Sequence, residues 1–309
     1  MKRVLVTGAS GFIGRHCLPI LLARGYEVYA VGFRTSEVTL LGVHWRRADL
    51  LDANQIVDLL RDTQPTHLMH FAWCTTPGTY WTMPENLNWL QASLTLVQAF
   101  VQNGGQRLVT AGTCAEYDWH YGYCSEMVTP LMPTTLYGTC KNSLHHVLTA
   151  FAKEAGLSAA WGRIFFVYGP FEQQQRLVPS VINSLLRGEA ARCSHGNQIR
   201  DFLHVEDVAD AFVALLNGEM SGPVNIASGL PLALKDVIGE IAARFNRPDL
   251  VEWGAIAAAA DEPPFLVADT RRLTAEVGWT PRHNLVSGLA QTIEWWRRRF
   301  EYATYESAA

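Results

Sequence analysis

Three glycines near the N-terminus restrict the fold of this chain more than any other feature. Gly8, Gly11 and Gly14 are three residues apart in the segment TGASGFIG, which separates an apolar, β-branched run from apolar residues at helical spacing. Glycine permits the tight turn that joins a strand to a helix, and the free N–H groups at the start of that helix favour a pyrophosphate. The segment therefore predicts a strand–turn–helix unit that binds a dinucleotide, with a purely structural turn as the alternative. The residues predicted to contact the dinucleotide here are Gly8, Ser10, Gly11, Phe12, Ile13 and Gly14.

Strand-like and helix-like segments alternate after this unit. The strand-like runs are residues 28–31, 67–72, 107–111 and 159–167, and the helical segments are residues 53–62, 85–103 and 135–155. Such alternation predicts the α/β class, with a doubly wound parallel sheet of Rossmann type and helices on both faces. The alternation loosens after residue 168. We therefore expect a dinucleotide-binding Rossmann domain at 1–168 and a smaller α/β substrate-binding lobe at 169–309, with a boundary that the chain crosses more than once.

Charge and composition argue against several classes of protein. The 309 residues carry a net charge of −4 without a block of like charges, so nucleic acid is not expected as a partner. No stretch reaches about eighteen apolar residues, so no membrane span is expected, and the N-terminus lacks the pattern of a secretory signal. The six cysteines are scattered without a CxxC pair. We therefore expect a cytoplasmic protein with reduced thiols and no metal site.

The end of the second strand bears on the choice of nicotinamide cofactor. An acidic residue there usually binds the adenosine ribose of NAD, whereas this chain has Arg34 and Ser36 and no carboxylate before Glu37. Arg34 and Ser36 would hold a 2′-phosphate, so NADP(H) is favoured and NAD(H) is the alternative. A solvated loop charge is the other interpretation of Arg34. Asp49 and Leu50, after a further strand-like stretch, are predicted to cover the adenine.

Tyr137 and Lys141 form a YxxxK pair. Residues four apart lie on one face of a helix, so the ammonium is expected near the phenol, where it would favour the phenolate. Thr113, at the end of the strand-like run 107–111, would bind the substrate oxygen and align it for proton transfer. The alternatives are a buried phenol, a surface lysine and a threonine that only ends a strand.

These motifs, taken in order, resemble the extended short-chain dehydrogenase/reductase family, of the NAD-dependent epimerase/dehydratase type that modifies nucleotide sugars. The likeness spans nearly the whole chain. Its segments are TGASGFIG at 7–14, HFAW at 70–73 where H-[LF]-A-A is usual, Thr113 with YxxxK, YGP at 168–170, RDFLHVEDV at 200–208, NIASG at 225–229 and DTRRLTAEVGWTP at 269–281.

The resemblance implies roles for individual residues. Thr113, Tyr137 and Lys141 would be the catalytic residues. Arg200 would bind the phosphates of the sugar nucleotide, with an ion pair to Asp201 or Glu206 as the alternative. The residues that would line the cofactor are Phe71, Ala72, Trp73 and Lys141, and those that would contact the substrate are Thr113, Phe166, Leu177, Val178 and Arg200.

Two departures from the family narrow the expected reaction. Cys114 and Ala115 follow Thr113 where the 4,6-dehydratases carry Asp-Glu, and Glu116 is displaced by one residue, so dehydration is not expected. Phe166 stands where many members have asparagine. We predict that NADPH reduces the keto group of a nucleotide-linked deoxysugar, with Tyr137 as the proton donor. The alternatives are a nucleotide-sugar 4-epimerase with tightly bound NAD and a non-catalytic NADP-binding sensor.

The resemblance also implies a homodimer. The helical segments 85–103 and 135–155 match the two helices that pair across the family's four-helix interface. The second segment carries an apolar stripe, which would pack either on a partner or on the chain's own sheet. The residues of the stripe are Leu144, Val147, Leu148 and Phe151.

Overall fold

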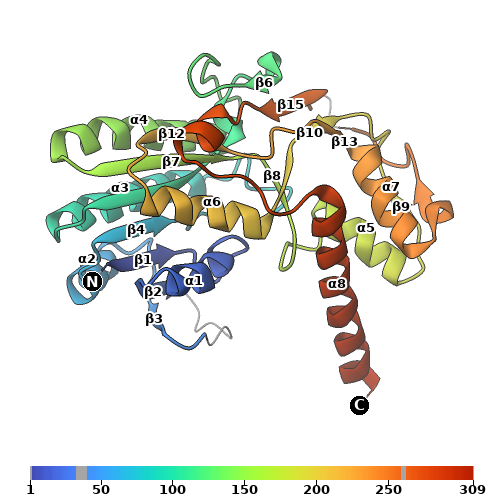
Figure 1. Ribbon diagram of the computed structural model, residues 1–309, viewed down its shortest axis with the longest axis horizontal. Helices are drawn as coiled ribbons and strands as arrows, with labels where there is room; N and C mark the ends of the chain where they lie inside the picture. Colours follow the sequence, from blue (N-terminus) through green and yellow to red (C-terminus); the bar gives the residue numbers. More distant parts are fainter. Residues whose placement is uncertain (1, 33–39, 259–261, 309) are drawn as a thin grey trace.

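Seven parallel strands form the central sheet of the computed structural model, which describes residues 2–32, 40–258 and 262–308 (Figure 1). In order across the sheet they are β12 (Gly222–Ile226), β7 (Ser158–Ile164), β5 (Arg107–Thr113), β4 (His67–His70), β1 (Arg3–Thr7), β2 (Glu27–Gly32) and β3 (Val43–Arg47). The chain builds outward from β1 in one direction and from β4 in the other. Ligands of such sheets bind where the direction reverses, beyond the carboxyl ends of the strands. The predicted α/β, doubly wound fold is confirmed, and Thr7 and His70 end the two strands at the reversal point.

Helices cover both faces of this sheet. One face carries α1 (Gly14–Ala23) and α6 (Val205–Asn217), and the other carries α2 (Ala53–Thr63), α3 (Glu85–Gln102) and α4 (Leu136–Ala155). Thr135 caps α4 by accepting a hydrogen bond from the Gly138 N–H, and Gly156 ends the helix in the left-handed conformation. On the predicted dimer stripe of α4, Leu144 and Leu148 are buried against the chain's own sheet, whereas Val147 is exposed.

A second group of elements lies beside the central sheet (Figure 1). Its strands are β8 (Phe166–Tyr168) with β11 (Phe202–His204), β9 (Ala191–Arg192) with β14 (Val251–Glu252), and the sheet of β13 (Leu232–Ala233), β10 (Ile199–Arg200), β15 (Phe265–Ala268) and β6 (Tyr123–Cys124). The helices α5 (Leu177–Leu186), α7 (Leu234–Phe245) and α8 (Leu285–Ala308) share a core with residues such as Ile182, Ile241 and Leu289. The chain passes between the two groups several times, because α6 and β12 return to the central sheet.

The structure shifts two of the predicted strand ends. The run predicted at 107–111 continues to Thr113, which therefore ends β5 at the carboxyl edge of the sheet. The run predicted at 159–167 is two strands, because the chain leaves the central sheet after Ile164 and pairs with β11 from Phe166 onward. Among the described residues, no helix is both long and apolar enough to cross a membrane.

Candidate active site

Two positions of the turn between β1 and α1, 8 and 14, have room only for glycine. Gly8 has a φ of +66°, and a Cβ added to it would lie 2.8 Å from the Ala72 nitrogen. A Cβ on Gly14 would collide with the Gly8 carbonyl oxygen. In the described part of the chain no side chain caps α1, whose start adds backbone N–H groups to the turn, and Ser10 and Gly11 are exposed there. This cradle of backbone donors fits a pyrophosphate, so a dinucleotide would be held here.

Thr7 and His70 join the two central strands beneath this turn. The Thr7 hydroxyl lies 2.7 Å from His70 Nδ1, and His70 Nε2 lies 2.8 Å from the Ser93 hydroxyl. Burial lowers the pKa of His70 to about 3, so the ring is neutral and both of its nitrogens are occupied. The Ala72 N–H donates to the Thr7 hydroxyl over 3.3 Å, which fixes the segment predicted to line the cofactor. Sequence reasoning did not identify this network.

The predicted cofactor residues fall into different environments. Asp49 and Leu50 follow β3. Asp49 is half-buried and accepts a hydrogen bond from the Leu51 N–H, and Leu50 is buried. Phe71 packs edge-on against Phe212 of α6, with ring centroids 4.8 Å apart, so its side chain belongs to the core on that face. Two further predicted residues, Arg34 and Ser36, lie outside the described residues.

Thr113 and Tyr137 come together at the carboxyl end of β5. Both side chains are buried, and the Thr113 hydroxyl faces the Tyr137 phenol closely enough to favour its ionised form. Burial raises the pKa of Tyr137 well above its usual 10, although the neighbouring Thr113 hydroxyl acts in the opposite direction. The site therefore holds the phenol in its protonated form, beside a hydroxyl that lies at the predicted substrate position.

Lys141 lies one turn further along α4 and is also buried. Its ammonium donates to the Ala111 carbonyl over 3.0 Å and lies 4.0 Å from the centroid of the Trp73 ring. The Trp73 Nε1 is itself fixed by Asn86 Oδ1 at 2.8 Å. Burial lowers the pKa of Lys141 to about 7, and the charge of Glu116 opposes that effect. The sequence spacing predicted that the ammonium lies near the phenol. In the structure its contacts are the Ala111 carbonyl and the Trp73 ring.

Aromatic rings enclose the Tyr137 phenol. Tyr80, Trp81 and Trp73 all lie edge-on to it, with ring centroids 4.9, 5.7 and 6.4 Å away. The Tyr137 N–H also donates to the Trp81 carbonyl over 3.1 Å, which anchors the start of α4 to this wall. Sequence reasoning missed Tyr80, whose only signal was its position next to Trp81 in an aromatic-rich segment.

Glu116 is committed to a structural ion pair. It is fully buried, lies 2.7 Å from the Arg163 guanidinium and accepts a hydrogen bond from Trp161 Nε1 over 3.0 Å. It also accepts the Thr113 N–H over 2.8 Å, which holds the end of β5 in place. A carboxylate with these partners is not free to exchange protons with a substrate. The geometry therefore agrees with the expectation that Glu116 does not replace the dehydratase acid.

Arg200 is buried and forms an ion pair, but its partner is neither Asp201 nor Glu206. Its guanidinium lies 2.8 Å from Glu262 Oε1 and 5.3 Å from the Phe166 ring centroid. The alternative of Asp201 or Glu206 as partner is wrong. Asp201 instead accepts the backbone N–H groups of residues 228, 229 and 268, which fold around it. The Arg200 guanidinium, expected to bind phosphate, is thus paired with the Glu262 carboxylate from a distant segment.

The two residues expected at the nucleotide base begin α5. Val178 is almost fully buried in the core that α5, α7 and α8 share, and Leu177 packs on the same core while remaining half-exposed. Of the two, only Leu177 has surface available to a ligand.

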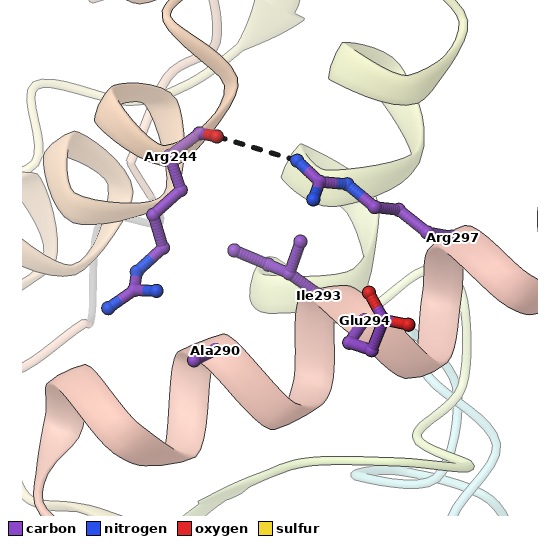
Figure 2. A pocket seen from close by; sticks show the side chains of 5 residues that line it. All are labelled: Arg244, Ala290, Ile293, Glu294 and Arg297. Carbon is purple, nitrogen blue, oxygen red and sulfur yellow. Dashed lines mark hydrogen bonds between the residues drawn. The ribbon is translucent and has the colours of Figure 1, made fainter.

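A hollow of about 270 Å³ lies between α7 and α8 (Figure 2). Arg297 reaches across it to the Arg244 carbonyl, and Ile293 points into it. It shares no residue with the predicted site. The candidate active site is the place where Thr113, Tyr137 and Lys141 meet, at the carboxyl edge of the central sheet.

Comparisons with known proteins point to one family. A family model described as "NAD dependent epimerase/dehydratase family" matches residues 4–227. UDP-glucose 4-epimerase of Corynebacterium glutamicum is 27% identical and aligns over 91% of each chain. MoeE5, solved in complex with UDP-glucuronic acid and NAD, is 32% identical over 96% of this chain and 99% of its own, with a TM-score of 0.84. Thermus thermophilus UDP-glucose 4-epimerase, solved with NAD, is 27% identical over the same shares, with a TM-score of 0.83.

Proposed function

The chain belongs to the NAD-dependent epimerase/dehydratase family, and from that premise we propose that it is an enzyme that oxidises and re-reduces the sugar of a nucleotide sugar, as a 4-epimerase does. The observation that carries this proposal is the pair of Thr113 and Tyr137, buried together at the carboxyl edge of the sheet. Such a pair can bind a sugar hydroxyl and exchange its proton while the hydrogen on the same carbon is transferred as hydride.

The cofactor we propose is NAD, which would accept a hydride from the sugar and return it. The turn of Gly8, Gly11 and Gly14 would hold its pyrophosphate, and Ala72 and Trp73 would line its nicotinamide end. Two of the relatives, MoeE5 and the Thermus epimerase, were solved with NAD, which supports NAD over the NADP(H) favoured by sequence alone.

The chain's own residues divide the proton transfer between them. Tyr137 would take the proton of the sugar hydroxyl and return it, and Thr113 would align that oxygen. Burial disfavours the phenolate that this transfer requires. A neighbouring positive charge is therefore needed, and Lys141 would supply it once its ammonium leaves the Ala111 carbonyl.

Purification and a turnover assay test this proposal. We expect the enzyme to retain NAD, detectable by mass spectrometry after denaturation, and to interconvert the C4 epimers of a UDP-hexose without added cofactor. Tyr137→Phe should lower turnover by about 10² to 10⁴-fold while NAD stays bound. Thr139→Val, at an exposed position on the same helix, is the control. Unchanged turnover in Tyr137→Phe would remove this residue from the mechanism.

The keto-sugar reductase is the second candidate, and one observation favours it. The sequence carries Arg34 and Ser36, and no carboxylate, directly after β2. A reductase should be isolated without cofactor and should consume one NADPH for each keto-sugar reduced. Loss of NADPH absorbance only in the presence of a 4-keto nucleotide sugar would decide for this candidate.

We also propose that α3 and α4 pair with a second copy of the chain. Each helix presents an apolar side chain to solvent, Leu87 on α3 and Val147 on α4, and both are about half exposed. Light scattering of the purified chain should give twice the monomer mass of 34.4 kDa.

A further inference from the structure

Two histidines and a glutamate lie together where the start of α6 meets the segment before α8. His204 ends β11, Glu206 is in the first turn of α6, and His283 precedes α8. One potential ligand atom from each lies within 4.8 Å of the other two. None of the three has a role in the proposed reaction, so the cluster needs a separate explanation.

His204 is buried without a hydrogen-bond partner. It is 1% exposed, and neither ring nitrogen has a partner among the residues that the structure describes. The Tyr168 ring lies edge-on to it at 5.4 Å, and the His283 ring lies 4.4 Å away. A buried polar group of this kind normally has a partner, and a bound ion is one of the partners that such a group can have.

Neighbouring groups hold the other two residues in place. Gln291 Nε2 donates to Glu206 Oε1 over 2.7 Å, and Glu206 Oε2 lies 3.4 Å from His283 Nε2. The buried Asp207 carboxylate accepts the backbone N–H groups of residues 282 and 283, at 3.0 and 2.9 Å. Gln291 thus orients the Glu206 carboxylate, as outer partners of ligands do at metal sites, and Asp207 holds the backbone that carries His283.

We propose that His204, Glu206 and His283 bind one divalent transition-metal ion of the zinc class. Two imidazoles and one carboxylate are a known ligand set for zinc, with water in the fourth position. Calcium and magnesium prefer sites built from oxygen atoms, so they fit this set poorly.

The geometry requires a small adjustment. Ligand atoms at about 2.1 Å from one ion lie at most about 4.2 Å apart, so the most distant pair must approach. Glu206 and His283 are partly exposed, at 33% and 22%, so small rotations of their side chains can close the gap while His204 stays fixed in the core. Their exposure also leaves a position open to water.

The ion would join two parts of the chain. Glu206 belongs to α6, which packs on the central sheet, whereas His204 ends β11 of the second group and His283 leads into α8 of that group. The positive end of the α6 dipole opposes a cation at this place. Glu206 lies in that same turn and supplies the compensating negative charge.

Zinc binding by the full chain, without a histidine tag, tests the proposal. After treatment with a chelator and dialysis, the protein is titrated with ZnCl₂ by calorimetry, and bound zinc is measured by elemental analysis. We expect one zinc ion per chain and a higher melting temperature with zinc. Co²⁺ should add the visible absorption of a tetrahedral site.

Variants locate the ion. Removing a ligand in Glu206→Gln or His283→Gln should weaken zinc binding by at least about 100-fold, and Gln291→Ala by about 10- to 100-fold. Both ligand residues are partly exposed, so these variants should fold, which circular dichroism checks. His44→Gln, at an exposed histidine on the edge strand β3, should bind as the unaltered chain does. Equal binding by the two ligand variants, or no binding by the unaltered chain, would overturn the proposal.

Discussion

Replacing Lys141 with methionine should stabilise the cofactor-free protein while it removes the activity. Lys141 is 3% exposed and holds its ammonium against the Ala111 carbonyl and the Trp73 ring. Burial lowers its pKa from 10.5 to about 7. The folded protein therefore carries a charged group that water would solvate better, and methionine fills a similar space without the charge.

The size of the effect follows from the pKa. Lowering it from 10.5 to about 7 corresponds to about 5 kcal/mol, at 1.36 kcal/mol for each pH unit. Because the folded pKa is below the unfolded one, this cost is fully present below about pH 7 and disappears as the pH rises toward 10.5. The variant's advantage should therefore fall from about 5 kcal/mol near pH 6 to about 2 kcal/mol near pH 9. Lost contacts with Ala111 and Trp73 subtract about 1–2 kcal/mol, which leaves a net gain of about 3–4 kcal/mol near pH 6.

Urea denaturation of cofactor-free protein near pH 6 and near pH 9 measures this difference. Lys153→Met, at an exposed lysine in the last turn of the same helix, is the control and should change stability by less than about 0.5 kcal/mol at both pH values. A gain that does not change with pH, or a loss of stability near pH 6, would refute the argument from burial.

Two further substitutions test the ion pairs around the site. Glu262→Gln should free the Arg200 guanidinium and tighten binding of a nucleotide sugar in calorimetry, whereas weaker binding would show that the carboxylate itself assists. Glu116→Gln should leave Arg163 as an uncompensated buried charge and lower the free energy of unfolding by about 3–5 kcal/mol in urea titrations; a change below about 1 kcal/mol would contradict a structural role for this pair.

Sequence periodicity predicted the parts of the fold that depend on neighbouring residues. The glycine turn, the covering helices and the parallel sheet follow from spacing within about twenty residues, and α4 begins and ends within one residue of the predicted segment. Thr113 and Tyr137 could be paired because both belong to short motifs at the same edge of the sheet. Strand ends were less predictable, since the departure of β8 from the central sheet depends on its pairing with β11, 36 residues along the chain.

Contacts between distant segments were beyond sequence reasoning. Glu262 is 62 residues from Arg200, and neither its type nor its spacing marked it as the partner. His283 likewise joins His204 only because the segment before α8 folds back on α6. Phe71 was assigned to the cofactor by its motif, but the direction of its ring depends on α6, more than a hundred residues later.

Trp73 connects the departure from the family's sequence pattern with the chemistry of the site. The resemblance leads one to expect alanine at this position, and the indole here lies over the Lys141 ammonium. Burial acts on the two titratable groups of the site in opposite directions, since it raises the pKa of Tyr137 and lowers that of Lys141. Both groups are thereby driven toward their neutral forms, whereas proton transfer needs the phenolate and the ammonium together. An indole that attracts a cation without offering a competing hydrogen-bond acceptor favours the charged lysine inside the site. The tryptophan thus compensates in part for the burial of the ammonium.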